Sequence, residues 1–460
     1  MYRSISRLIM FRELGQDSII TNLGNIIRDM EQGDYDKDDI VSRIYGEIHK
    51  ILEISTSYGF DKNLWYDYIT YVLVTNENPF TLTCERAEIE KGSVNSITIS
   101  DMMNFIDIYK YDFSKIEKEL DIDCFTTITH YQSVHKRQQV YNRNVSKRVR
   151  KLSDEISATL EAESADKVKC AEKILGLLMD FYKAYGVGML GLNKAFRIIP
   201  ADEYVKNAYD GSDGGSEVHF TPIKNTDNVV LDDLIGYDIQ KQKLRDNTEA
   251  FVKGLPSHNV LLFGDAGTGK STSIKALINE YYDVGLRMIE LYKHQMGDLS
   301  AIISRIKNRN YRFIIYMDDL SFEENETEYK YLKAVIEGGL ETRPDNVLIY
   351  ATSNRRNLIR ETWNDINDLE MDKHHSDTVQ EKLSLVSRFG VTIGYIRPNK
   401  KEFDEIIRGL AAKQLKVQIS DEELLKEATK WEISHGGMSG RSAQHFIDYM
   451  NAMEGLKDND

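Results

Sequence analysis

Residues 259–274, NVLLFGDAGTGKSTSI, decide how the second half of this 460-residue chain is expected to fold. The run 260–263 is short and apolar, as in a buried parallel strand. Residues 264–271 then follow the pattern G-x-x-x-x-G-K-S, and an apolar-periodic helix comes next. A strand, a glycine-rich loop and a helix in this order are the context that a phosphate-binding P-loop requires. The stretch therefore predicts a nucleotide site.

Each part of this motif has a chemical role. Glycines let backbone N–H groups curl around a phosphate, and the N-terminus of a helix carries about half a positive charge. We expect Lys270 to reach the β- and γ-phosphates of a nucleotide and the Ser271 hydroxyl to ligate Mg²⁺. The alternative, a glycine-rich turn that merely precedes a helix, is weakened by the matching strand and helix. The residues expected to hold the nucleotide here are Gly264, Asp265, Ala266, Gly267, Thr268, Gly269, Lys270, Ser271 and Thr272.

The composition is that of a soluble globular protein. Charged residues make up 29% of the chain and hydrophobic residues 41%, and the length suits two or three domains. The net charge of −15 is evenly spread: −8 up to residue 230 (28 Lys and Arg, 36 Asp and Glu) and −7 beyond it (31 and 38). Because neither half is basic, bulk charge excludes a whole domain built for nucleic acid, and only a local patch stays open.

The cysteines and the N-terminal residues indicate the cellular compartment in which the protein is expected. Cys84, Cys124 and Cys170 are scattered and odd in number, which argues against a disulfide framework or a zinc site and favours a reducing environment. The N-terminal apolar run 8–11 is too short for a secretory signal, and no run approaches membrane-spanning length. We expect a cytoplasmic protein that does not cross a membrane.

Residues 1–225 are expected to form a mostly helical domain that recruits a partner or substrate. Apolar residues recur at helical spacing within 38–55, 61–74 and 166–185. The run DGSDGGS at 210–216 indicates a flexible linker near 210–225.

One segment of this half stands out by its charge. Between residues 136 and 151 there are seven basic side chains and no acidic one. The run could contact phosphates or an acidic partner, but a solvated helix face that pairs with the acidic stretch 154–163 is the favoured interpretation. The basic residues are Lys136, Arg137, Arg143, Lys147, Arg148, Arg150 and Lys151.

From residue 226 onwards strands alternate with helices, which predicts a parallel sheet covered on both faces. The expected strands are 260–263, 285–291, 313–317, 346–351 and 391–395. Asp318 and Asp319 follow the third strand, and ligands of such sheets lie at the carboxyl ends of the strands. We therefore expect Asp318 to hold the Mg²⁺ shell and Asp319 to polarise the attacking water as a general base. The alternative is a pair of aspartates in a surface turn.

The order of these motifs resembles the AAA+ ATPases. The P-loop and the strand ending in D-D are followed by A-T-S-N, S-R-F-G and a late G-M-S-G-R. The resemblance implies an α/β P-loop NTPase core with a five-stranded parallel sheet between helices at 226–398, a helical lid at 399–460, and Mg-ATP as the ligand. The resemblance to this family covers roughly residues 185–450. The boxes DDLSFE and ATSNRR further resemble an uncharacterised, domain-of-unknown-function prokaryotic AAA+ group with a helical N-terminal domain.

The same resemblance implies roles for residues that the motif arguments alone do not assign. Asn354 would be the sensor-1 residue, which hydrogen-bonds the attacking water or the γ-phosphate. Arg388 would be the arginine finger, which stabilises transition-state charge on a neighbouring subunit's nucleotide. Arg441 would be the sensor-2 residue of the lid. The turn Ile235, Gly236 and Tyr237 would cradle the adenine.

The chain departs from the family at one catalytic position. Most AAA+ enzymes have glutamate where this chain has Asp319, whose side chain is one methylene shorter. Glu323 and Glu324 lie close in sequence and could substitute for it.

Other polar residues in this half admit two interpretations. Arg355 and Arg356 are candidates for phosphate or intersubunit contacts, or else belong to a charged loop. His374 and His375 could suggest a metal, but without a third ligand at a recognisable spacing a solvated loop is favoured.

These observations predict an ATPase in which water attacks the γ-phosphate in line. A finger that acts on a neighbouring site requires a homo-oligomer. Remodelling or assembly of a protein partner is the favoured role. The alternatives are a nucleic-acid-associated loader or initiator that uses the run at 136–151, and a nucleotide-dependent scaffold that hydrolyses ATP slowly.

Overall fold

The computed structural model describes residues 1–14, 17–86, 92–132, 143–200, 218–223, 226–322, 326, 328–337, 344–356, 358 and 385–457. By its internal contacts the chain divides into two compact units. The first comprises Met1–Lys194 and Ile199–Asn225, and the second comprises Ala195–Ile198 and Thr226–Asp460. Several residues singled out above lie outside the described parts: Lys136, Arg137, the run 210–216, Glu323, Glu324, His374 and His375.

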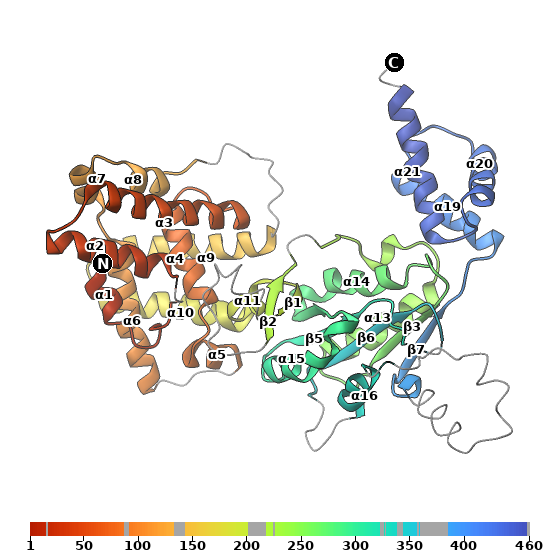
Figure 1. The fold of residues 1–460 in the computed structure, drawn as a ribbon, viewed down its shortest axis with the longest axis horizontal. Helices are drawn as coiled ribbons and strands as arrows, with labels where there is room; N and C mark the ends of the chain where they lie inside the picture. Colours follow the sequence, from red (N-terminus) through yellow and green to blue (C-terminus); the bar gives the residue numbers. More distant parts are fainter. Residues whose placement is uncertain are drawn as a thin grey trace. The chain divides into compact units, whose positions relative to one another are not determined.

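The first unit is built mainly from helices (Figure 1). Local sequence sets their ends, as in α3, where the Asp36 carboxylate accepts the N–H groups of Asp38 (2.8 Å) and Asp39 (3.2 Å). The helices are α1 (Tyr2–Ser6), α2 (Ile19–Gln32), α3 (Lys37–Tyr58), α4 (Leu64–Thr75), α5 (Pro79–Arg86), α6 (Ser93–Tyr109), α7 (Ser114–Leu120), α8 (Cys124–Thr129), α9 (Arg143–Ala162), α10 (Lys167–Tyr185) and α11 (Gly188–Leu192).

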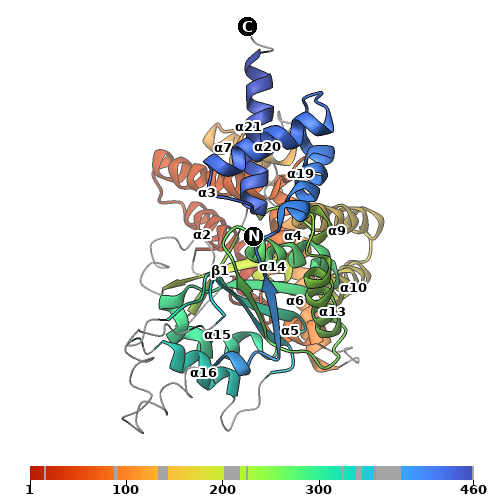
Figure 2. The same ribbon diagram turned by 90° about the vertical axis from the view of Figure 1, so that its right-hand side faces the viewer.

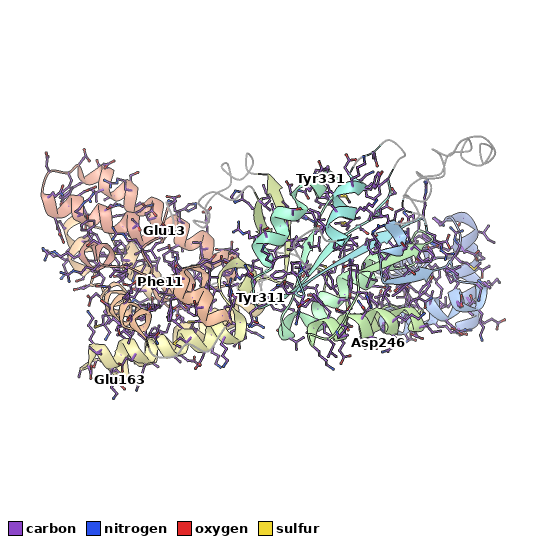
Figure 3. All side chains as sticks on the ribbon, turned by 90° about the horizontal axis from the view of Figure 1, so that it is seen from below. Phe11, Glu13, Glu163, Asp246, Tyr311 and Tyr331 are labelled. Carbon is purple, nitrogen blue, oxygen red and sulfur yellow. The ribbon has the colours of Figure 1, made fainter. Side chains whose placement is uncertain are left out.

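These helices enclose a large apolar core of their own. Figure 3 shows Phe11 inside this unit, and its ring packs edge-on against Phe105 with the centroids 5.5 Å apart. The segment before α2 is fixed by the buried carboxylate of Asp101 in α6, which accepts the N–H groups of Ile9 and Phe11, each at 2.9 Å. A buried carboxylate is stable only when hydrogen bonds replace its water, so Asp101 ties the N-terminal segment to α6.

A seven-stranded sheet runs in the order β2-β1-β4-β5-β6-β3-β7, and the pairs along β1-β4-β5-β6-β3-β7 are parallel. The five strands expected from the sequence are present as β3 to β7. Two more, β1 and β2, were not predicted, because short apolar runs beside a helix carry no distinguishing periodicity. The strands are β1 (Ala195–Pro200), β2 (Val218–Pro222), β3 (Val260–Gly264), β4 (Leu286–Glu290), β5 (Arg312–Met317), β6 (Val347–Ser353) and β7 (Val391–Tyr395).

Helices cover both faces of the strands. Those named α13 (Asp238–Val252) and α14 (Lys270–Tyr281) lie on one side, and α15 (Leu299–Ile306) and α16 (Tyr329–Glu337) lie on the other (Figure 2). In the strand order, the connection from β3 to β4 moves towards β1, whereas the connections from β4 to β5 and from β5 to β6 move towards β7. Right-handed crossovers therefore put α14 on the face opposite α15 and α16. The loop after β3 lies where the strand order reverses, the usual ligand position in such sheets.

The last helices form a small bundle with its own core. They are α19 (Lys400–Gln414), α20 (Asp421–Ser434) and α21 (Gly440–Lys457). Phe403, Ile407 and Ala428 are among its buried residues. Three short 3-10 helices complete the second unit: η1 (Leu231–Asp233), η2 (Tyr282–Val284) and η3 (Lys293–Asp298). Within the described residues, none of the helices is long and apolar enough to span a membrane.

Candidate nucleotide-binding site

The glycine-rich loop leaves the middle of the sheet between β3 and α14. Strand β3 is hydrogen-bonded to β6 on one side and to β7 on the other. Gly264 ends it with φ +133°, and a Cβ there would overlap the Tyr395 carbonyl, so only glycine fits this close crossing. Gly267 and Gly269 also have positive φ, +77° and +91°. The Thr268 hydroxyl closes the turn by donating to the Asp265 carbonyl at 2.8 Å.

Lys270 points into this loop from the first turn of α14. Its Nζ donates to the carbonyl oxygens of Gly264 (2.9 Å) and Asp265 (2.7 Å) and to Oδ1 of Asn354 (3.1 Å). The residue is only 6% exposed. Burial lowers the pKa of the ammonium from its ordinary value, and the carboxylates of Asp319, Asp265 and Asp318 oppose that shift. A lysine ammonium beside a glycine-rich loop is the arrangement that a phosphate-binding loop requires.

Asp318 follows β5 and accepts two hydroxyl groups. Its Oδ1 atom receives hydrogen bonds from Ser271 Oγ and Thr352 Oγ1, both at 2.6 Å. Burial alone would raise the pKa of this carboxyl group, but the hydrogen bonds from Ser271 and Thr352 oppose it, and the pKa is lowered. Asp318 is therefore ionised at neutral pH and lies beside the hydroxyl that the sequence assigned to Mg²⁺.

Asp319 has an unusual backbone conformation for a residue other than glycine, with φ +49°. Its N–H donates to Thr352 Oγ1 at 2.9 Å, and its Oδ1 accepts from Asn354 Nδ2 at 2.7 Å. Because Asn354 also accepts from Lys270, these polar groups form one continuous chain of hydrogen bonds. Strained backbone of this kind persists where the surroundings hold it in place.

The register of the sheet explains why these residues meet. Strands β5 and β6 are neighbours, and Met317 pairs with Ala351. The residues that follow each strand are thus brought side by side at the same edge, next to the loop that follows β3.

The N-terminus of α21 lies against the glycine-rich loop. The backbone N–H of Arg441 donates to the carbonyl of Gly267 at 3.0 Å. A Cβ added at Gly267 would come within 3.1 Å of Ser439 Oγ and 3.2 Å of Arg441 Cβ. The Arg441 side chain is exposed. The structure therefore puts the predicted sensor-2 residue directly beside the loop.

The turn before α13 lies between the loop and α19. Tyr237 stacks on Tyr395 with the ring centroids 5.0 Å apart, and its hydroxyl donates to the Ile396 carbonyl at 2.8 Å. Ile235 packs closely against Gly409 of α19, where an added Cβ would meet its side chain at 2.8 Å, while Gly236 has φ +79°. The predicted adenine cradle is thus an apolar and aromatic turn next to the loop.

Arg388 lies at the other end of the parallel strands, where they begin. It is half-buried in the turn just before β7. In the β3–β7 pair, Val391 lies opposite Val260, whereas Tyr395 lies opposite Gly264. Four residues of strand, about 13 Å at 3.3 Å per residue, thus separate the two ends of β7. The structure thus does not bring Arg388 to the loop of its own chain, and its role as an arginine finger stays a prediction.

Two further arginines follow β6. The N–H of Arg355 donates to Ser353 Oγ at 3.2 Å, and the Arg356 guanidinium lies 5.8 Å from the centre of the Phe263 ring. Both are exposed. Their proposed phosphate or intersubunit contacts stay a prediction.

Sequence reasoning missed Thr352. It treated the residue only as part of the run that ends β6, yet this hydroxyl bonds both aspartates. The signal that could have identified it is the pairing of β5 with β6, because a polar residue two positions before Asn354 must then face the D-D pair. That pairing requires the strand order, which the sequence did not provide.

The donor set fits a magnesium nucleotide. Mg²⁺ keeps several waters and takes only one or two protein oxygens besides the phosphates. The Ser271 hydroxyl and the Asp318 carboxylate supply such oxygens at 2.6 Å from each other. In the described parts of the chain, no group of three or more His, Cys, Asp or Glu residues could hold a metal by itself.

Comparisons with known proteins identify one family and several solved structures that this chain resembles. Residues 206–454 match the family described as "Protein of unknown function (DUF815)". No curated protein matches the sequence. Among solved structures, two point mutants of RuvB from Thermotoga maritima match with TM-scores of 0.35 and 0.36 and identities of 20% and 21%. Each covers 50% of this chain and 66% or 67% of the other. A third, titled as the T. maritima RuvB Holliday junction branch migration motor, matches with TM-score 0.30 and 18% identity over 48% of this chain and 72% of that one.

Proposed function

We propose that this chain, which belongs to the DUF815 family and has the AAA+ P-loop fold, binds Mg-ATP and hydrolyses it. One observation carries the proposal. Lys270, Asn354 and Asp319 form a continuous chain of hydrogen bonds at the mouth of the glycine-rich loop, beside the Ser271–Asp318 pair. An anion-binding ammonium, an ionised carboxylate and a hydroxyl are thus gathered within one site.

Each group of the site has its own role in the reaction. The backbone N–H groups of the loop and the Lys270 ammonium bind and orient the β- and γ-phosphates. Asp319, held by Asn354, accepts the proton of the attacking water. When bound, Mg²⁺ neutralises charge on the phosphate oxygens. Arg388 of a neighbouring copy stabilises the charge that develops in the transition state, which makes the working form an oligomer.

We further propose that hydrolysis drives the remodelling or assembly of a protein partner recruited by the helical first unit. Two basic residues of the run 136–151, Arg148 and Lys151, have partners inside the chain, which favours a protein rather than a nucleic acid as the partner. The Arg148 guanidinium lies 4.3 Å from the Tyr185 ring centre, and Lys151 pairs with Glu155 at 3.7 Å. Side chains with partners inside the chain are less available for phosphates.

A nucleotide-dependent scaffold is the second candidate, and Asp319 favours it. Its carboxylate is one methylene shorter than that of the glutamate usual in the resembling family, so it reaches less far from the backbone. Such a protein would bind ATP with ordinary affinity and hydrolyse it very slowly. Single-turnover hydrolysis by the assembled protein, measured by rapid quench, distinguishes the two candidates.

The Lys270→Ala variant tests the proposal. Removing the ammonium should reduce kcat/KM for ATP by about 100-fold or more, as for the loss of other groups that stabilise transition-state charge. The Lys253→Ala variant is the matched control, because Lys253 is an exposed lysine that pairs with Glu249 at the end of α13. ATP hydrolysis and binding of a fluorescent ATP analogue are the measurements. Unchanged hydrolysis and binding in Lys270→Ala would rule out the assignment of the loop.

A further inference from the structure

Thr352 is a buried residue with two polar partners from one neighbouring segment. It belongs to β6 and is 1% exposed. Its Oγ1 donates to Oδ1 of Asp318 at 2.6 Å and accepts from the backbone N–H of Asp319 at 2.9 Å. A hydroxyl has one hydrogen and two lone pairs, so it can make both bonds at once.

The two bonds have different effects. The bond to Asp318 meets the one from Ser271 at the same oxygen, so two hydroxyl groups fix the direction of that carboxylate. The bond from the Asp319 N–H holds a residue whose φ of +49° is rarely adopted by an L-amino acid. That backbone angle in turn directs the Asp319 side chain to Asn354, with which it makes a 2.7 Å bond.

We propose that Thr352 is the positioning residue of this site: its single hydroxyl sets the orientation of both aspartates, and thereby the affinity for Mg²⁺ and the placement of the attacking water. The inference rests on the proposed function, since it concerns the same site. Groups that orient metal-binding side chains typically change metal affinity or activity about 10–100-fold when they are lost.

The experiment compares two substitutions at this position in the full-length chain. Thr352→Val keeps the shape and the strand preference of the side chain but removes the hydroxyl, whereas Thr352→Ser keeps the hydroxyl and loses the methyl group. Thr248→Val is the control, because Thr248 is equally buried and its hydroxyl bonds only Leu244 and Tyr350 on α13 and β6.

The main measurement is independent of hydrolysis. Binding of a fluorescent ATP analogue is titrated with Mg²⁺, and the Mg²⁺ concentration at half-maximal enhancement of binding is recorded. Thr352→Val should raise this concentration about 10-fold or more, while binding without Mg²⁺ stays unchanged. Thr352→Ser and Thr248→Val should stay within about 3-fold of the wild type. Steady-state hydrolysis should show kcat falling further than KM rises in Thr352→Val alone.

The outcomes distinguish the positioning role of Thr352 from the proposed function. If wild-type protein binds the analogue with Mg²⁺ and Thr352→Val gives the same Mg²⁺ titration, the positioning role is wrong and the proposed function stands. If Thr352→Ser is as impaired as Thr352→Val, packing of the methyl group rather than the hydroxyl is responsible, and the role is also wrong. If the wild type binds no nucleotide at any Mg²⁺ concentration, the proposed function fails and takes this inference with it.

Discussion

At the scale of the residue, Asp319 combines an unusual backbone conformation with a predicted catalytic role. Its backbone lies in the left-handed region at φ +49°, and its side chain is the candidate general base. Aspartate and asparagine are the residues other than glycine that tolerate this region best, because their short polar side chains bond locally. This offers a physical reason for aspartate at a position where the resembling family has glutamate.

Asp319→Asn separates the charge of this residue from its conformation. Asparagine tolerates the same backbone angle and keeps an Oδ1 atom that accepts from Asn354. We expect nucleotide binding within about 3-fold of the wild type and hydrolysis slower by about 10²–10⁴-fold, the usual contribution of a general base. Filter binding and phosphate release measure the two quantities.

Another residue provides the control for this substitution. Asp121 ends α7 in the same left-handed conformation, φ +57°, in the first unit. Asp121→Asn should change neither binding nor hydrolysis. Full hydrolytic activity of Asp319→Asn would exclude Asp319 as the base, and a joint loss of binding and hydrolysis would point to a structural role instead.

How far the site was predictable from the sequence depends on the kind of residue. Lys270, Ser271 and Asp318 were identified because their spacing from a strand or loop is a local property. The structure brings these residues together with Asp319 and Asn354, and their roles stay predictions. Thr352 was missed because its partners are distant in sequence and meet it only through the pairing of β5 with β6.

At the scale of the element, α4 and α9 pack around a buried carboxyl group. Asp67 of α4 is 5% exposed and accepts the Asp61 N–H at 3.3 Å. Burial raises its pKa to about 6, and hydrogen bonds from Ser153 and Asp61 and the charge of Arg150 only partly oppose the shift. The folded state therefore favours the protonated form of this group.

This shift makes the stability of the first unit depend on pH. Because the folded pKa of about 6 lies above the ordinary value of 3.8, the contribution is complete below 3.8 and is lost as pH rises through about 6. At about 1.4 kcal/mol per pKa unit, the free energy of unfolding should fall by at most about 3 kcal/mol between pH 4 and 7. Urea denaturation followed by circular dichroism across this range measures it.

A neutral side chain at the same position should remove this dependence. In Asp67→Asn the contribution of residue 67 is absent, so we expect a flatter pH profile and a more stable first unit at pH 7. Asp180→Asn on α10, where the aspartate is exposed, is the control and should keep the wild-type profile. A wild-type profile in Asp67→Asn would show that other groups cause the pH dependence.

The elements themselves were predicted with uneven success. Strands β3 to β7 were recognised because each is an apolar run followed by polar residues, and their bounds differ from the expected ones by at most two residues. Strands β1 and β2 were not, since runs such as AFRIIP and VHFTP resemble loop or buried helix equally well. Strand order is set by long-range packing, which no local pattern encodes.

At the scale of the whole molecule, the strand register separates Arg388 from the glycine-rich loop. The loop lies at the carboxyl end of β3, whereas Arg388 precedes the amino end of β7. A strand of this length keeps Arg388 away from its own loop. Action of Arg388 on a neighbouring subunit was implied only by the family resemblance, and it stays a prediction.

Mixing two defective variants tests whether Arg388 acts on a neighbouring copy. Lys270→Ala subunits lack a working loop but keep Arg388, and Arg388→Ala subunits have the reverse defect. Each alone should be nearly inactive in ATP hydrolysis, and Arg388→Ala should still bind nucleotide. In a random equal mixture half the subunits have a working loop, and half of these neighbour an intact Arg388, so about a quarter of wild-type turnover should return.

The matching control places both defects in one chain. A mixture of the double variant Lys270→Ala/Arg388→Ala with Arg388→Ala contains no intact Arg388 and should stay inactive at every ratio. The recovered activity of the first mixture should also disappear on dilution, because only assembled copies share a site. If the first mixture stays as inactive as its components at concentrations where the wild type is assembled and active, Arg388 does not complete a neighbour's site.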